Sequence, residues 1–162
     1  MGKASGYQAI MATPLGRIGV RMHADAISAL DFLPADTAEQ APADAATGVA
    51  VTQLQSYFRD SRSPLTVRLA PVGTAFQQRV WAALHMIPAG TVLSYGELAR
   101  QLGTAARAIG GACRNNPIPV VIPCHRVVSR RGLGGYAGEV DGDLPGIKRW
   151  LLRHEGVVIE AR

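Results

Sequence analysis

The spacing of apolar residues changes at one point in this chain, the segment Pro71-Val72-Gly73. Before that segment, over residues 18–22, apolar residues alternate with other residues, which is the period of a strand. After it, over residues 76–87, apolar residues recur at the spacing of a helix. Because the two periods belong to different kinds of packing, we expect an α+β chain with two domains that meet at this segment.

The first predicted domain, residues 1–72, is a small antiparallel sheet with one helix. Residues 18–22 and 27–32 predict two paired strands, residues 51–58 predict a helix, and residues 65–69 predict a further strand. The chain has 162 residues, of which 48% are hydrophobic, so it can bury one substantial core or two small ones.

The second predicted domain, residues 73–162, is mainly helical. Ser94-Tyr95-Gly96-Glu97 matches a capping box, and Gly103 is placed to end the helix that this box begins. Thr104 is expected to cap a second helix over residues 105–114. Two short helices joined by a tight turn that contains glycine predict a helix-turn-helix, with a winged-helix-like arrangement.

Positive charge is concentrated in the second domain. Residues 1–70 carry six Lys or Arg and six Asp or Glu, whereas residues 71–162 carry eleven against six. One-sided clustering of arginine is typical of a nucleic-acid surface, since the guanidinium group suits phosphates and bases. The alternative is a solvated basic face that has no partner.

The second helix of the pair is built from small residues. Ala105, Ala106 and Gly110 leave a narrow helix from which Arg107 projects. Helix-turn-helix proteins that read a base sequence present several polar side chains to the major groove, and this helix has few. We expect a close approach to the minor groove that does not depend on base sequence. An ordinary helix hairpin with tight packing is the alternative.

Pro123-Cys124-His125-Arg126 places one of the two cysteines beside a possible base and an arginine, after an apolar run. The thiolate is the reactive form of cysteine, and nearby positive charge favours it. We expect a reactive cysteine, and the alternative is a small buried hydrophobic residue. With only two cysteines, a disulfide scaffold is not expected, and a reducing, cytoplasmic setting is.

Two further groups bear on the chemistry of this cysteine. A final helix over about residues 145–155 ends at Glu155, whose carboxylate could orient the imidazole of His125 as the third member of a triad does. Cys113 and Cys124 are too far apart in sequence for a paired zinc motif, so no metal site is expected. No apolar run approaches the ~20 residues of a membrane span, so no membrane partner is expected.

From Phe76 to Gly156, about half of the chain, the motifs resemble the O6-alkylguanine-DNA alkyltransferases, also called methylated-DNA–protein-cysteine methyltransferases. The resemblance rests on Pro123-Cys124-His125-Arg126-Val127, preceded by Asn116-Pro117 and followed by Tyr136 and His154-Glu155-Gly156. It implies a ribonuclease-H-like first domain, with which the β-rich pattern of the first half is compatible.

The resemblance also implies the residues of the site. Cys124 would accept the alkyl group, His125 would act as its base through a water, and Glu155 would orient His125. Asn116 would support the site by hydrogen bonding, and Tyr95 would help to rotate and hold the base.

The same resemblance implies how DNA is bound. Arg107 would fill the gap left by an extruded nucleotide, and the Val127 carbonyl would accept a hydrogen bond from the guanine amino group. Tyr136, with the backbone at Ala137 and Gly138, would line the base pocket. The remaining DNA contacts are assigned to Ala105, Ala106, Gly110 and Arg114.

The implied activity is repair of O6-alkylguanine in double-stranded DNA, with O4-alkylthymine as a second substrate, by a monomer that needs no cofactor or metal. The alkyl group would stay on Cys124 as a thioether, so each molecule would act once. The segment 137–145 is longer than usual in the family and carries three acids, which puts the adduct size and pocket access in question.

Three other functions remain open on the sequence alone. A non-catalytic lesion-binding protein would lack the acceptor cysteine, which this chain has at Cys124. A helix-turn-helix regulator would need a helix that reads base sequence better than residues 105–111 do. A hydrolytic Cys-His enzyme would leave the arginine-rich helix pair unexplained.

Overall fold

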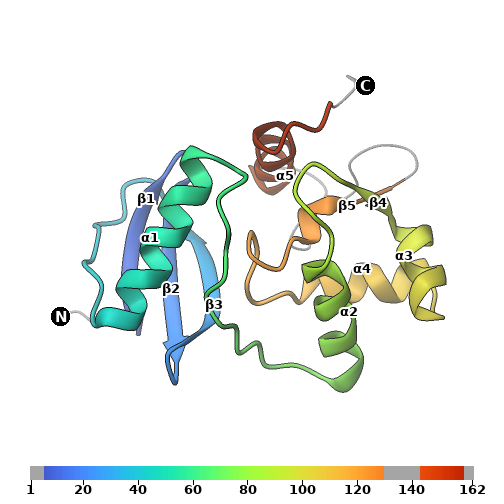
Figure 1. Ribbon diagram of the computed structural model, residues 1–162, viewed down its shortest axis with the longest axis horizontal. Helices are drawn as coiled ribbons and strands as arrows, with labels where there is room; N and C mark the ends of the chain where they lie inside the picture. Colours follow the sequence, from blue (N-terminus) through green and yellow to red (C-terminus); the bar gives the residue numbers. More distant parts are fainter. Residues whose placement is uncertain (1–5, 130–142, 159–162) are drawn as a thin grey trace. The chain divides into compact units, whose positions relative to one another are not determined.

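A computed structural model describes residues 6–129 and 143–158, with the backbone alone for 143–145. The chain forms two compact units, Met1–Val72 and Gly73–Arg162 (Figure 1). The predicted α+β class is confirmed, with a small antiparallel sheet in the first unit and helices dominating the second. Over the described ranges, no helix has the length and apolar character needed to cross a membrane.

The sheet of the first unit is an antiparallel meander of three strands, in the order β1 (Ala9–Thr13), β2 (Gly16–His23) and β3 (Ala26–Leu33). Ala24 and Asp25, which join β2 to β3, both have positive φ, 49° and 65°. Two consecutive left-handed residues match the right-handed twist of a two-residue hairpin. The strands predicted from residues 18–22 and 27–32 are therefore confirmed, and β1 adds an edge.

Helix α1 (Ala45–Arg59) covers one face of this sheet (Figure 1). The Asp44 side chain accepts from the Thr47 amide at 2.8 Å and caps the helix. Leu54 is fully buried and Val51 nearly so. The apolar spacing over residues 51–58 therefore predicted the buried face correctly.

The strand predicted over residues 65–69 is wrong. Leu69 makes an isolated bridge to Ile27, and no further ladder forms in the described part of this segment. The Gln53 side chain explains the difference, because its Oε1 accepts from the backbone amides of Thr66 and Val67 at 2.8 and 3.0 Å. These amides are satisfied by a helix side chain and do not need a neighbouring strand.

In the second unit, α2 (Ala75–His85) carries Trp81 into the core. The Trp81 indole Nε1–H donates to the carbonyl of Ala112 at 2.9 Å, which fastens α2 to the helix that contains Ala112. A buried indole needs such an acceptor, and this bond fixes the two helices in register.

The helix pair consists of α3 (Tyr95–Leu102) and α4 (Ala106–Arg114). The predicted capping box is confirmed, since Ser94 Oγ accepts from the Glu97 amide and Glu97 accepts from the Ser94 amide. Gly103 ends α3 in the left-handed region at φ 67°. The predicted cap at Thr104 is wrong, because Ala105 occupies the N-cap of α4 without a side-chain hydrogen bond.

Three short elements assemble beside this pair. The 3-10 turn η2 (Cys124–Arg126) leads into β5 (Val127–Val128), which pairs in parallel with β4 (Leu93–Ser94). Helix α5 (Asp143–His154) packs on η2. The parallel pair brings the start of α3 next to the segment that follows the Cys-His motif.

Candidate active site

Cys124 opens the turn η2 and is 3% exposed. The loop before it is fastened by Asn116, whose Nδ2 donates to the Ile122 carbonyl at 2.8 Å and whose Oδ1 accepts from the Ile118 amide at 2.9 Å. Asn116 thus ties both ends of the run that leads to the cysteine, which limits the positions that the thiol can take.

The same loop contains a strained residue. Val120 has φ 75° and is 1% exposed. A β-branched residue is rare in the left-handed region, and such strain amounts to about 1–3 kcal/mol. The loop keeps this conformation because its ends are fixed by Asn116 and its side chains are buried.

His125 is fully buried and is joined to Glu155, the residue that follows α5. Its Nε2 lies 2.8 Å from Glu155 Oε2. An ionised carboxylate can only accept, so Nε2 carries the proton and Nδ1 keeps its lone pair. Nδ1 has no hydrogen-bond partner within the described residues. Burial lowers the pKa of His125 despite Glu155, and Arg126 and Lys148 add to the lowering, so the resting imidazole is neutral.

Arg126 forms a buried two-point ion pair with Glu155. Its Nε donates to Oε1 and its Nη2 to Oε2, both at 2.8 Å, while Nη1 donates to the Ile87 carbonyl. Arg126 therefore holds the carboxylate that holds His125. The sequence placed Arg126 next to the cysteine and did not indicate this pair.

Lys148 is a buried residue of the site that the sequence analysis missed. Its side chain is fully buried on α5, and Nζ donates to the Val127 carbonyl at 2.8 Å. Burial lowers the pKa of Lys148 to about 8, against opposing attraction from Cys124 and Cys113. One signal was available, because Lys148 lies three residues before the apolar Leu151 and therefore on the same face of the helix.

Tyr95, the first residue of α3, lies with its ring centroid 5.7 Å from the Lys148 Nζ. Burial raises the pKa of Tyr95, and negative charge at Cys113 or Cys124 raises it further, so the phenol keeps its proton. Burial also raises the pKa of Cys113 to about 12, with Cys124 adding to it, so Cys113 stays a neutral thiol. The Tyr95 phenol on α3 and the Lys148 amine on α5 therefore both lie near Cys124.

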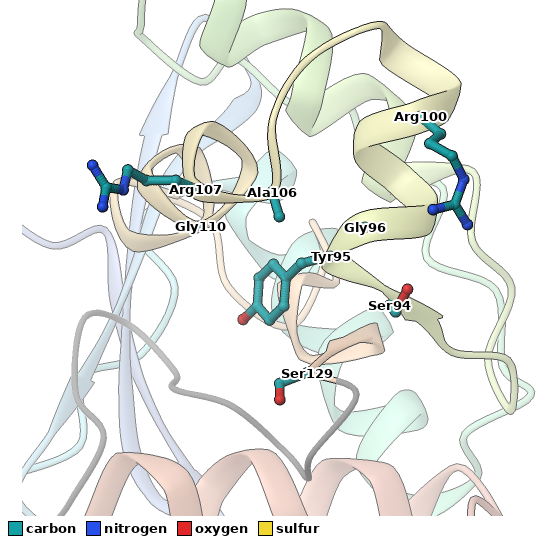
Figure 2. A pocket seen from close by; sticks show the side chains of 8 residues that line it. All are labelled: Ser94, Tyr95, Gly96, Arg100, Ala106, Arg107, Gly110 and Ser129. Carbon is teal, nitrogen blue, oxygen red and sulfur yellow. The ribbon is translucent and has the colours of Figure 1, made fainter.

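A cavity of about 630 Å³ opens beside Tyr95, between the two helices of the pair and β5 (Figure 2). Its lining residues are Ser94, Tyr95, Gly96, Arg100, Ala106, Arg107, Gly110 and Ser129. Four of the predicted site residues are among them, and Arg107 extends outward from α4 (Figure 2). Ala105 precedes this helix, and Arg114 ends it.

The remaining predicted residues fall into two groups. Val127 is buried, and its carbonyl already accepts from Lys148, which leaves its second lone pair for another donor. Tyr136, Ala137 and Gly138 lie outside the described residues, as does most of segment 137–145. Where the structure describes the chain, no three His, Cys, Asp or Glu residues gather as a metal site would require.

Both halves of the chain match family models. Residues 7–71 match the ribonuclease-like domain of 6-O-methylguanine DNA methyltransferase, and residues 75–157 match the DNA binding domain of the same family.

Relatives and solved structures agree with these models. A methylated-DNA–protein-cysteine methyltransferase of Salmonella typhimurium is 50% identical over 66% of this chain, and the match spans 62% of that protein, less than two thirds. One of Methanosarcina acetivorans is 37% identical over 93% of this chain and 98% of its own. The crystal structure of Mycobacterium tuberculosis OGT in complex with DNA has a TM-score of 0.75 at 38% identity and covers 91% of each chain.

Proposed function

Because the chain belongs to the 6-O-methylguanine DNA methyltransferase family, we propose that it repairs DNA by moving an alkyl group from guanine O6 to Cys124. The observation that carries this proposal is the buried Cys124 next to His125, whose Nε2 is held by Glu155 and whose Nδ1 has no hydrogen-bond partner among the described residues. This arrangement suits one proton transfer from a thiol to a base.

Extrusion of the damaged nucleotide comes first. The O6 alkyl group is stacked inside the duplex, so the nucleotide must leave the stack at a cost of a few kcal/mol. The narrow helix α4 allows a close approach to the minor groove, and Arg107 takes the space that the nucleotide vacates. The cavity beside Tyr95 is large enough to admit a base.

His125 is the base that makes the thiolate. Its Nδ1 lone pair accepts the proton of Cys124, through a bridging water, while the Nε2–H bond to Glu155 keeps the ring in place. Since Arg126 balances the charge of Glu155, the carboxylate acts mainly by orientation. The Lys148 ammonium supplies positive charge that favours the thiolate.

The thiolate then attacks the alkyl carbon. A sulfur–carbon bond forms as the carbon–O6 bond breaks, and the electron pair of that bond goes to the guanine. Tyr95 is protonated before the reaction, and its phenol donates that proton to the leaving guanine. The product is a thioether, which has no carbonyl for water to attack, so the chain reacts once and irreversibly. Asn116 and the Val127 carbonyl position the cysteine loop and the guanine.

The partner in this proposal is double-stranded DNA that contains O6-alkylguanine, with O4-alkylthymine as a further substrate. The acting species is a monomer without a cofactor. Two cysteines outside any disulfide and a thiolate nucleophile fit a reducing, cytoplasmic location.

Mass spectrometry of the protein after mixing with a duplex that contains O6-methylguanine tests the proposal. We expect one methyl group on the peptide that contains Cys124, with a maximum of one per molecule. Cys124→Ser should bind the duplex and gain no methyl group. Methylation of that variant to the same extent would refute the mechanism, and tight binding of the lesion without any adduct would indicate a non-catalytic sensor.

A further inference from the structure

Two arginines lie at opposite sides of the cavity beside Tyr95. Arg107 extends from α4, and Arg100 lies on the outer side of α3, with Tyr95 between them in Figure 2. The role of Arg107 is part of the proposed function. Arg100 has no role in the mechanism so far.

Within the described residues, the Arg100 guanidinium makes no hydrogen bond or ion pair. Some other arginines do: Arg17 donates to a backbone carbonyl, and Arg21 pairs with Asp31. In the second unit Arg126 pairs with Glu155. A guanidinium that lines a cavity without an internal partner keeps all its donors for a ligand.

The surroundings of Arg100 suit an anion. Its Nη1 lies 3.8 Å from the point where a Cβ would stand on Gly96, and Ser94 Oγ lies 3.9 Å from that point. The absence of a side chain at residue 96 leaves the guanidinium accessible. The acid one turn before Arg100, Glu97, accepts from the Ser94 amide at 2.7 Å in the capping box.

We propose that Arg100 binds a backbone phosphodiester of the damaged strand next to the extruded nucleotide, on the side of the cavity away from Arg107. This inference rests on the proposed function. A nucleotide leaves the stack by rotation about the phosphodiesters on its two sides, so one fixed phosphate leaves the strand free to pivot. A guanidinium can hold a phosphate with two parallel hydrogen bonds, which fixes its orientation as well as its position.

The test combines a protein variant with a DNA variant, in the Cys124→Ser background so that no alkyl transfer occurs. One phosphodiester at a time near the lesion is replaced with a neutral methylphosphonate, and binding is measured by fluorescence anisotropy. At one position flanking the lesion, the substitution should weaken binding by about tenfold. With Arg100→Ala, which alone weakens binding to a similar extent, the same methylphosphonate should have no further effect.

The salt dependence gives a second readout. Loss of one phosphate contact should reduce the slope of log affinity against log salt concentration by about 0.9. Arg59→Ala, an equal change in charge at an exposed position of α1, should leave the slope and every methylphosphonate effect as in the parent. Arg100 is itself exposed, so the variant should fold; circular dichroism checks this, and Arg100→Gln provides a second neutral replacement.

The inference is overturned if every methylphosphonate weakens binding by Arg100→Ala as much as binding by the parent. Failure of the proposed function gives a different result, namely no methyl transfer to Cys124 in the otherwise unchanged chain. A methylphosphonate effect that disappears only in Arg107→Ala would assign the contact to Arg107 and also overturn the inference.

Discussion

The two units differ in the polar and ionisable side chains that they bury. Among the described residues of the first unit, Thr47 is the one buried polar residue, and its hydroxyl donates to Asp44 at 2.7 Å. Among the described residues of the second unit, besides its two cysteines, four residues with ionisable side chains are buried: His125, Arg126, Lys148 and Glu155. The first unit follows the rule that a core is apolar, and the second departs from it around one cysteine.

The residues buried in the second unit lower its stability but serve the reaction at Cys124. Burying charge opposes folding unless each charge is paired and hydrogen-bonded. In the second unit, the free-energy cost of burying charge adds to the backbone strain at Val120. An apolar core around Cys124 would fold with less opposition, but it could not hold a base in one orientation or favour a thiolate.

The largest effect should come from breaking the buried ion pair. Arg126→Met leaves Glu155 buried without its guanidinium and should lower the free energy of unfolding by about 3–5 kcal/mol. Arg21→Met removes the half-exposed pair with Asp31 and should cost at most about 1 kcal/mol. Urea unfolding of both variants measures this, and equal losses would contradict the contrast between the units.

A core truncation in the first unit should affect stability alone. Leu54 is fully buried in α1, so Leu54→Ala should cost about 2–5 kcal/mol. The rate of methyl transfer, measured where the variant is folded, should stay within about twofold. Ile109→Ala is the matched change in α4, equally buried, and should slow transfer because this helix carries Arg107. A slow Leu54→Ala protein would show that the first unit shapes the reaction.

The buried ammonium predicts a pH dependence. The pKa of Lys148 is about 8 when folded, against about 10.4 when unfolded, so the unfolded chain binds more protons between these values. Below pH 8 the folded chain bears the full cost of burying the Lys148 ammonium. As the pH rises, the ammonium loses its proton and this cost disappears. The free energy of unfolding of the unmodified chain should therefore rise relative to that of Lys148→Met, by up to about 3 kcal/mol.

Unfolding of both proteins from pH 7 to 10 measures this difference. The titratable groups that interact with Lys148 are Tyr95 on α3, Cys113 on α4, and Cys124 and His125 in η2. All four remain in the Met variant, so the two proteins differ only in Lys148 and in its effect on these groups. A difference that stays flat across this range would mean that Lys148 is not desolvated.

The smallest effect concerns a helix cap. Ser94→Ala removes the capping box of α3 and should cost about 1 kcal/mol. It should also slow transfer, since Tyr95 begins that helix. Thr74→Ala removes the equivalent box of α2 and should cost as much without changing the rate of transfer. Equal rates for the two variants would show that the cap does not position Tyr95.

Local features were predictable from the sequence. The capping box at Ser94 and the end of α3 at Gly103 depend on residues within one turn, and both were predicted correctly. The prediction for Thr104 was wrong by one residue: its amide bonds back to the Ala99 carbonyl at 2.9 Å and completes the end of α3, and Ala105 is the N-cap of α4.

Contacts between distant residues were not predictable in the same way. Arg126 and Glu155 are 29 positions apart, and Lys148 and Val127 are 21 apart. Spacing does not show which elements pack together, so a lysine on α5 looks like a surface residue until the helix is placed. The pairing of His125 with Glu155 was expected from triad chemistry and implied by the family resemblance, and the two side chains lie within hydrogen-bond distance.

Cys124 also bears on how long a molecule lasts after it has reacted. The residue is 3% exposed, so an alkyl group on its sulfur adds volume at a buried position. Extra volume in a packed interior costs about 1–3 kcal/mol, so the fold of the reacted chain is weaker. Cells degrade unstable chains faster, so molecules that have already reacted would be cleared before those still able to act. The lifetime of the protein would then be set by its own reaction.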